Sequence, residues 1–265
     1  MGIVRFLVSF LLLALLLEGA ASGKAIPPPE DYGMVMIGKL SAQTRMPPVR
    51  FDHWLHRAFY TCRVCHVEIG FAMEAGGTGI TAETNAKGFH CGTCHDGRKR
   101  HEEKTIFPSC PYPSSPREGD ECAKCHSRGN DNERTYKYAT FAASLPKQRL
   151  GNLVDWEEAE ARGLVRPVDG LSDLSGHRPS LAPQADFSIS SKGFWMPDII
   201  FSHRKHARWN GCEVCHPEIF PTAREDSMKY SMFQISEGEY CGLCHDRVAF
   251  PLNDCGRCHS SQVHR

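Results

Sequence analysis

The sequence has no excess of charge of either sign, little apolar character and no sustained strand pattern. Lys and Arg number 31 and Asp and Glu also number 31, so the polypeptide lacks the basic surface that binds nucleic acid. Only 41% of the 265 residues are hydrophobic and the mean hydropathy is −0.39, which excludes a polytopic membrane protein. Alternation of apolar and polar residues never extends far. With 23 Gly and 17 Pro, we expect short helices and much irregular backbone.

Cysteine and histidine are abundant instead, at 13 and 14 residues. Twelve cysteines form six C-x-x-C-H motifs, at Cys62–His66, Cys91–His95, Cys122–His126, Cys212–His216, Cys241–His245 and Cys255–His259. Zinc sites need four ligands, so cysteine pairs would have to combine, and the histidine after each pair would stay unexplained. A thioredoxin-like pair would be single and set in a βαβ unit. Structural disulfides require no histidine.

C-x-x-C-H is the attachment signature of c-type haem. Two thiols add to the vinyl groups of one haem, and the next histidine binds its iron from the proximal side. We therefore predict six covalently bound haem c groups. The predicted attachment residues are Cys62, Cys65, Cys91, Cys94, Cys122, Cys125, Cys212, Cys215, Cys241, Cys244, Cys255 and Cys258. The predicted proximal ligands are His66, His95, His126, His216, His245 and His259.

The N-terminus has the pattern of a secretory signal peptide, which we predict over residues 1–22. Arg5 is its basic residue, Phe6–Leu17 its apolar run, and small residues near Ala21 suit cleavage. The run is short for a transmembrane helix, so an uncleaved anchor is the less favoured alternative and no stable membrane span is expected after cleavage. Export places the cysteines outside the reducing cytosol. We expect a periplasmic location, or an extracellular one on the outer surface of the cell.

The chain contains an internal duplication with an offset of 150 residues. Phe51–Ile69 aligns without gaps to Phe201–Ile219, and the second motif of each copy keeps the offset. The third motifs break it, because the first copy has an insertion around Arg98–Gly119. This insertion contains Cys110, the one cysteine outside the motifs, which stays open between a free thiol and an axial ligand.

The duplication predicts two three-haem domains, at residues 49–127 and 198–265. Residues 23–48 are expected to form an N-terminal linker, and residues 128–197 an interdomain segment. Within that segment Asp155–Arg162 predicts a short helix, because Asp155 can cap it, acidic residues fill its first turn and Gly163 follows its end.

Four histidines recur in an element F-x-H-x-x-H that precedes the first motif of each copy. They are His53, His56, His203 and His206. Histidines three residues apart on a helical turn project in nearby directions. We therefore predict these four as distal iron ligands.

The F-x-H-x-x-H element followed by three C-x-x-C-H motifs resembles the three-haem cytochrome c7 domain, a reduced relative of cytochrome c3. Two such domains in one chain resemble the multidomain nanowire cytochromes of metal-reducing bacteria. The resemblance covers Phe51–His126 and Phe201–His259. It implies a mostly irregular fold with short helices wrapped around haems, in two lobes. It also implies that the first histidine of each pair serves the first haem of its domain and the second histidine the second haem.

The resemblance also concerns the distal ligand of the third haem in each domain. In short c7 proteins a histidine shortly before the second motif supplies it, which His90 matches in the first domain. The second domain has Tyr240 there, and multidomain relatives use methionine for this haem. The resemblance therefore implies His90 and Met232. The alternatives are Met73 and His101 in the first domain and Met228 in the second.

Six haems leave about 40 residues each, too few for an ordinary hydrophobic core, so we expect the haems to form the core. Closely packed haems suit electron hopping, and their propionates would steer the acidic holoprotein to basic partner faces. We predict an electron carrier rather than an enzyme, acting in respiratory or extracellular electron transfer. Its expected partners are other redox proteins: inner-membrane donors and outer-membrane or soluble cytochromes. The alternative is a multihaem reductase with one open iron that acts on a small substrate.

Overall fold

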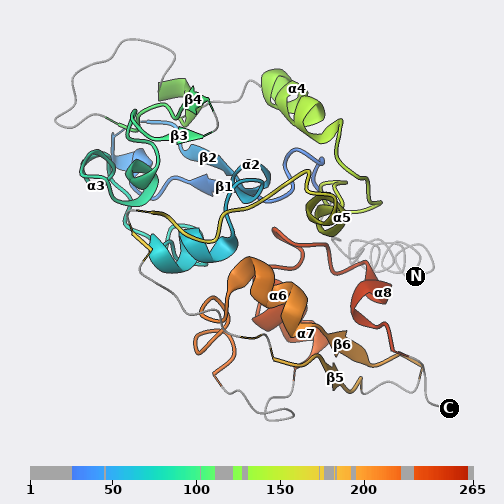
Figure 1. Ribbon diagram of the computed structural model, residues 1–265. Coiled ribbons are helices and arrows are strands. Elements are labelled where there is room, and N and C mark those ends of the chain that lie inside the picture. Colours follow the sequence, from blue (N-terminus) through green and yellow to red (C-terminus); the bar gives the residue numbers. More distant parts are fainter. Residues whose placement is uncertain are drawn as a thin grey trace, which may run out of the picture.

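The computed structural model describes residues 26–44, 46–101, 103–110, 122–126, 131–172, 174–175, 182, 184–191, 195–221 and 230–261. In these residues the chain is mostly loop, with short helices and three two-stranded antiparallel sheets (Figure 1). The predicted fold class is therefore confirmed. The predicted signal peptide lies outside the described residues. None of the helices in the described ranges is long and apolar enough to cross a membrane.

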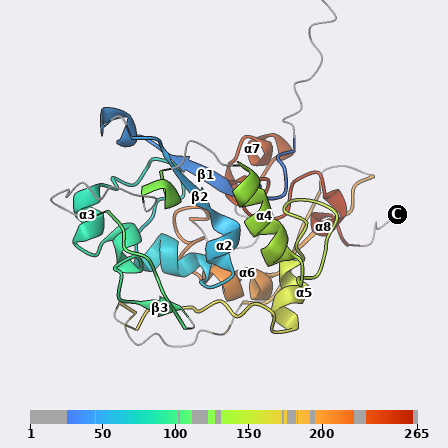
Figure 2. The ribbon, with the colours of Figure 1, turned by 90° about the horizontal axis from the view of Figure 1, so that it is seen from above.

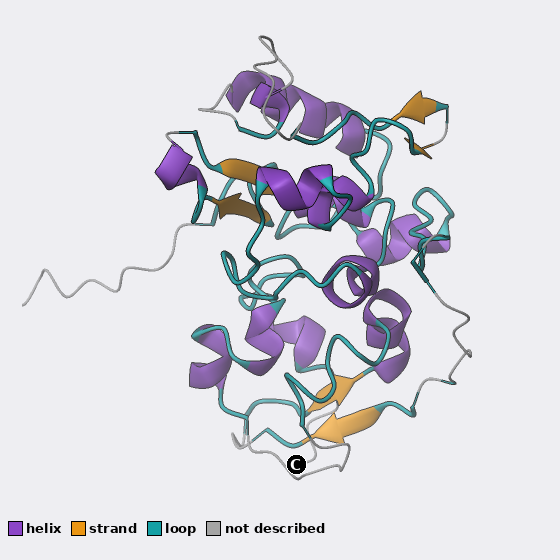
Figure 3. Cartoon of the chain, turned by 90° about the vertical axis from the view of Figure 1, so that its left-hand side faces the viewer, coloured by secondary structure: helices purple, strands orange, loops and turns teal. Residues whose placement is uncertain are grey.

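The chain folds into two lobes, which lie one above the other in Figures 1 and 3. The first lobe contains β1 (Met34–Ile37), a 3₁₀ turn (Ser41–Thr44), β2 (Val49–Asp52), α2 (His53–Arg57), a π-helical turn (Val64–Glu68), α3 (Ala82–Ala86), a 3₁₀ turn (His90–Thr93), β3 (Arg100–His101), β4 (Lys104–Thr105) and a 3₁₀ turn (Cys122–Lys124). The second contains β5 (Phe187–Ile189), β6 (Ile199–Phe201), α6 (His203–Asn210), α7 (Met232–Ser236), a 3₁₀ turn (Tyr240–Leu243) and α8 (Cys255–Cys258). Between the two lobes in the sequence come α4 (Asp131–Ala142) and α5 (Trp156–Ala161).

Each lobe begins with a hairpin whose second strand leads into a histidine helix. β1 pairs with β2, with Val35 opposite Phe51, and β5 pairs with β6, with Phe187 opposite Phe201. The sequence placed β1 in the N-terminal linker and β5 in the interdomain segment. Strands of three or four residues are too short to show a recognisable alternation. The paired strands hold the start of α2 and of α6 in the same way.

A second repeated unit positions the second motif of each lobe. The hydroxyl of Thr81 caps α3 by accepting a backbone N–H at 3.0 Å, and Ser231 caps α7 in the same way at 3.2 Å. Each helix then packs directly on its motif. A Cβ at Gly92 or Gly242 would lie 1.8 Å from a backbone oxygen at the end of the helix. Only glycine therefore fits the second position of CGTCH and CGLCH.

The segment between the lobes builds a hydrophobic core of polypeptide, which corrects the expectation that haems alone form the core. Figure 2 shows α4 and α5 next to α2. The buried residues are Trp54, Ala58, Tyr138, Ala142, Leu145, Val154, Trp156, Ala159 and Val165, with Phe59, Phe141 and Trp209 packed against them. Trp54 belongs to the first lobe and Trp209 to the second. The core therefore joins both lobes to the segment between them.

The two helices of this segment differ in how far the sequence predicts them. α5 begins where expected, since Asp155 Oδ1 accepts a hydrogen bond from Glu158 N at 3.0 Å, and Gly163 has φ +68° after the helix end. α4 was not predicted. Its apolar residues are few, and the buried ones, Tyr138 and Ala142, pack in a cluster with Trp54, about 80 positions earlier in the chain.

Leu145 offers a test of this core. Leu145→Ala should lower the free energy of unfolding by roughly 2–5 kcal/mol, because a leucine 7% exposed would leave a cavity in the cluster. Leu164→Ala is the matched control, since Leu164 is 49% exposed and should lose much less. Thermal and urea unfolding followed by far-ultraviolet circular dichroism measures both. Equal destabilisation by the two variants would contradict a core at this place.

Candidate haem sites

Three pairs of imidazole rings face each other across a gap that fits one iron atom. The ring centroids are 6.4 Å apart for His53–His66, 6.4 Å for His56–His95 and 6.2 Å for His206–His245. A metal bound at about 2.0 Å by one nitrogen of each ring puts the centroids about 6.2 Å apart. Each pair joins a histidine of the F-x-H-x-x-H element to a motif histidine. These are the partners that the resemblance implied.

The fourth predicted pair, His203 and His216, is not brought together in this way. The ring of His203 packs against Phe187 and Phe201, with centroids 5.3 and 5.0 Å away. His216 lies against Phe220 at 6.3 Å. Among the described residues, only the three pairs above join a repeat histidine to a motif histidine by ring contact.

The histidines of the repeats and motifs share one hydrogen-bonding pattern. In all ten, Nδ1 lies 2.6–3.2 Å from a backbone carbonyl oxygen; they are His53, His56, His66, His95, His126, His203, His206, His216, His245 and His259. A carbonyl oxygen can only accept, so Nδ1 carries the proton and donates. The lone pair is then on Nε2, the nitrogen left to bind a metal. The chain thus presents ten imidazoles in the tautomer that an iron ligand requires.

Burial keeps several of these imidazoles neutral. It lowers the pKa of His53 and of His245 to about 4. Burial also lowers the pKa of His56, His66, His95 and His206. An imidazole must be unprotonated at the coordinating nitrogen to bind iron, so these sites are ready for a ligand bond at neutral pH.

Most of the motif cysteines are partly buried, and these surroundings favour an uncharged form of the sulfur. Burial raises the pKa of Cys65 and Cys244 to about 12, and that of Cys91, Cys215 and Cys241 to about 11. A zinc site binds thiolates, which these surroundings disfavour. A thioether formed with a haem vinyl group carries no charge. The residues present therefore fit covalent haem.

Neighbouring motifs lie close enough for their cysteines to interact electrostatically. In the first lobe, Cys65 of the first motif lies within electrostatic reach of Cys91 and Cys94 of the second motif. Cys91 in turn lies within electrostatic reach of Cys125 of the third motif. The attachment points of the first lobe therefore follow one another without a gap.

The second lobe continues this order, and the two lobes meet through their motifs. Cys241 of the second motif in this lobe lies within electrostatic reach of Cys215 of the first motif and Cys258 of the third. Across the lobes, Cys62 interacts with both Cys215 and Cys244. One uninterrupted series of attachment points thus runs through both lobes.

The candidate ligands of the third haem in the first lobe lie apart. His90, with φ +50°, has Nδ1 3.3 Å from Thr84 Oγ1 and its ring 5.7 Å from Phe71. His101 packs on Phe59, with ring centroids 3.9 Å apart, and Met73 is half-buried. Among the described residues, no ring contact joins His90 or His101 to His126, the motif histidine of this haem.

Cys110, by contrast, does reach that motif. Its thiol hydrogen-bonds to the side chain of His126, which lowers the pKa of Cys110 and raises the pKa of His126. Sequence reasoning left Cys110 unassigned, because the spacing of Cys110 and His126 along the chain does not show that their side chains meet.

In the second lobe, Tyr240 occupies the position equivalent to His90 and has the same left-handed backbone conformation, with φ +51°. Its ring packs against Tyr230 at 5.0 Å and Phe220 at 6.2 Å. Met232 begins α7 with 52% of its surface exposed. The alternative Met228 lies outside the described residues.

One family model matches both copies of the repeat. The family model of cytochrome c7 and related cytochrome c matches residues 49–127 and 199–260, just over half of the chain. No significant match was found among curated proteins.

Solved structures similar to this chain include three of one multihaem protein. The dodecaheme cytochrome c GSU1996 is 22% identical with a TM-score of 0.27, and the match covers 90% of this chain and 50% of that one. Its C-terminal hexaheme fragment is 21% identical with a TM-score of 0.25, covering 88% and 98%. Its N-terminal hexaheme fragment is 22% identical with a TM-score of 0.25, covering 87% and 99%. The chain therefore spans half the length of the dodecaheme cytochrome.

Removing one histidine of a facing pair should open one iron. His53→Gln should let carbon monoxide bind about one more haem per chain than in the wild type, because an iron that has lost an axial ligand has a free position. Carbon monoxide difference spectra of the reduced protein measure this. His177→Gln is the control, since His177 belongs neither to a motif nor to an F-x-H-x-x-H element. Equal carbon monoxide binding by both variants would contradict the pairing of His53 with His66.

Proposed function

Because the chain belongs to the family of cytochrome c7 and related c-type cytochromes, we propose that it is a six-haem electron carrier that relays electrons between its two lobes. Multihaem c-type cytochromes are electron-transfer proteins, and members of this family are generally electron carriers. The haem irons supply the one-electron chemistry. The chain supplies the attachment points, the axial ligands and the spacing. Each of the six C-x-x-C-H motifs attaches one haem in this proposal.

The observation that carries the proposal is the unbroken series of motif cysteines. Electrostatic contacts link the motifs within each lobe, and Cys62 links the lobes through Cys215 and Cys244. Haems attached at such neighbouring points are held close together, which electron hopping needs. A carrier requires this proximity throughout, whereas an enzyme requires only one reactive site.

The axial ligands follow from the histidine geometry. We infer that His53, His56 and His206 are the distal ligands of the haems on His66, His95 and His245, and that His203 serves the haem on His216. For the third haem of each lobe, we propose His90 as the distal ligand of the haem on His126 and Met232 as that of the haem on His259. Cys110 is the alternative ligand in the first lobe. Irons with two protein ligands have no free position, which favours a carrier.

A second candidate function is a multihaem reductase with an open iron on His259. The observation in its favour is the half-exposed side chain of Met232, which a ligand bond would withdraw from solvent. Under the first proposal, binding of the haem draws Met232 inward. The two readings differ in whether that iron accepts an external ligand.

For location and partners, we propose an exported protein in the periplasm or on the outer surface, which exchanges electrons with other redox proteins. The signal-like sequence over residues 1–22 supports export. Inner-membrane donors and outer-membrane or soluble cytochromes are the partner classes that such a carrier would meet. The propionates of six haems would give the protein an acidic surface that favours basic partner faces.

The haem number can be counted directly. The intact mass of the purified protein should exceed that of the polypeptide by six haem units, which should survive acid–acetone extraction because thioether bonds hold them. Changing Cys255 and Cys258 together to Ser should remove one unit. Haem that is extracted by acid–acetone, or bound zinc in place of haem, would sink the proposal.

Met232 decides between carrier and reductase. The oxidised wild type should show a weak near-infrared thioether band and bind carbon monoxide slowly or not at all at the haem on His259. Met232→Ala should remove the band and admit carbon monoxide at one haem per chain. Met36→Ala, also at an exposed methionine, is the control and should change neither. Binding of carbon monoxide by the wild type at one haem per chain would favour the reductase.

A further inference from the structure

The two copies of the histidine helix differ at four of their first six positions, and at three of these the side chain of the first copy lies at the junction between the lobes. The first copy, α2 and its C-cap, has Trp54, Arg57 and Ala58, where the second copy, α6, has Arg204, Ala207 and Arg208. Trp54 and Ala58 are buried in the core that joins the lobes. Arg208 pairs with Glu160 of α5 at 2.6 Å. The duplicated helices have thus diverged where one lobe must contact the other.

Arg57 lies at the centre of this junction. Its guanidinium carbon is 4.3 Å from the ring centroid of Trp156 in α5 and 4.9 Å from that of Trp209 in α6. One terminal nitrogen donates a hydrogen bond to the carbonyl oxygen of Val248 at 3.0 Å. One side chain of the first lobe therefore touches the interdomain helix and two segments of the second lobe.

The guanidinium also has an unused donor. The Nε atom of Arg57 is buried and has no hydrogen-bond partner among the described residues. Arginine stays protonated in proteins, so a full positive charge is held here. A buried donor of this kind calls for an acceptor, and a carboxylate is the acceptor that suits a guanidinium best. Haem propionates are carboxylates.

Two haem attachment points lie beside this charge. The thiols of Cys62 and Cys244 are both within electrostatic reach of the guanidinium. Cys62 belongs to the first motif of the first lobe and Cys244 to the second motif of the second lobe. They also interact with each other. Arg57 therefore stands where the series of attachment points passes from one lobe to the other.

We propose that Arg57 raises the reduction potentials of the two haems attached at Cys62 and Cys244, and so makes both easier to reduce where the two lobes meet. The inference rests on the proposed function. A reduced haem carries one negative charge more than an oxidised one, so a buried cation stabilises the reduced form. Because the guanidinium lies within electrostatic reach of both attachment points, it would raise both potentials and leave the difference between them nearly unchanged.

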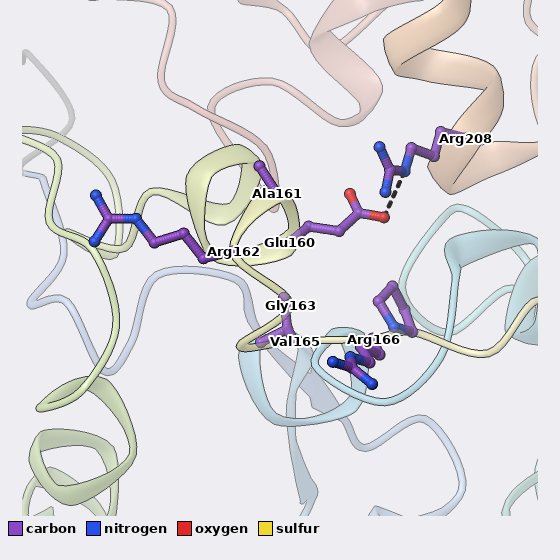
Figure 4. A pocket seen from close by; sticks show the side chains of 8 residues that line it. Glu160, Ala161, Arg162, Gly163, Val165, Arg166 and Arg208 are labelled. Atoms are coloured by element: carbon purple, nitrogen blue, oxygen red, sulfur yellow. Dashed lines mark ion pairs between the residues drawn. The ribbon is translucent and has the colours of Figure 1, made fainter.

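Arg208 provides a matched control at the same junction. Figure 4 shows Glu160 of α5 pointing toward Arg208 of α6, with their ion pair marked. The side chain of Arg208 is 62% exposed, so water and salt screen its charge. An effect of Arg57 that Arg208 does not share therefore comes from the partly buried charge of Arg57, and not from any cation at the junction.

The experiment is a redox titration of the holoprotein, followed haem by haem with paramagnetic NMR. Arg57→Met removes the charge and keeps the length of the side chain. It should lower the reduction potential of each of two haems by about 59 mV, which for a one-electron couple is a tenfold change in the equilibrium constant of reduction. Arg57→Lys keeps the charge and should restore most of the loss. Arg208→Met should leave all the potentials unchanged.

Three outcomes would overturn the inference: unchanged potentials in Arg57→Met, equal shifts in Arg57→Lys and Arg57→Met, or equal shifts in Arg208→Met. If Arg57→Met does not fold, Arg57→Gln, which can still donate to the Val248 carbonyl, carries the same expectation. The haem number of each variant is measured first. Fewer than six haems in the wild type would contradict the proposed function, whereas six haems with unshifted potentials contradict only the role of Arg57.

Discussion

The hydrogen bond from an imidazole Nδ1 to a backbone carbonyl is the interaction on which the rest of this structure depends. It recurs at every histidine of the motifs and of the F-x-H-x-x-H elements. It settles the tautomer, orients the ring and leaves Nε2 for iron. Nine of the ten carbonyls come from loops and turns, and the tenth, Asp52, ends β2, so a mostly irregular backbone can still hold ten rings. A chain with few regular elements therefore builds well-defined ligand sites.

The backbone that supplies these carbonyls is shaped by a few local devices that occur twice. A short hairpin sets the start of each histidine helix, and a capped helix of five residues packs on each second motif. The contact at Gly92 and Gly242 is so close that no side chain fits. These devices use local geometry rather than a large core.

The junction between the lobes follows a different principle. Here the chain has a polypeptide core with two tryptophans, Trp54 and Trp156, and a third, Trp209, at its edge. Aromatic rings bury a large apolar area and can also stack on a guanidinium. The rings of Trp156 and Trp209 do so with the guanidinium of Arg57. Salt bridges from α6 to Glu157 and Glu160 of α5 add to the contact. The segment between the domains thus acts as a structural part that fixes one lobe against the other.

The sequence alone determined the chemistry of this protein. Six C-x-x-C-H motifs, two F-x-H-x-x-H elements and a constant offset predict the attachment residues and define the repeat, because these depend on covalent spacing along the chain. The same holds for α5, whose cap Asp155 is local. Only the tertiary structure decided the rest: the carbonyl partners, the helix α4, the contact of Cys110 with His126, and the place of Arg57 between the lobes. These depend on segments far apart in sequence that come together on folding, and no spacing rule records which segments will meet.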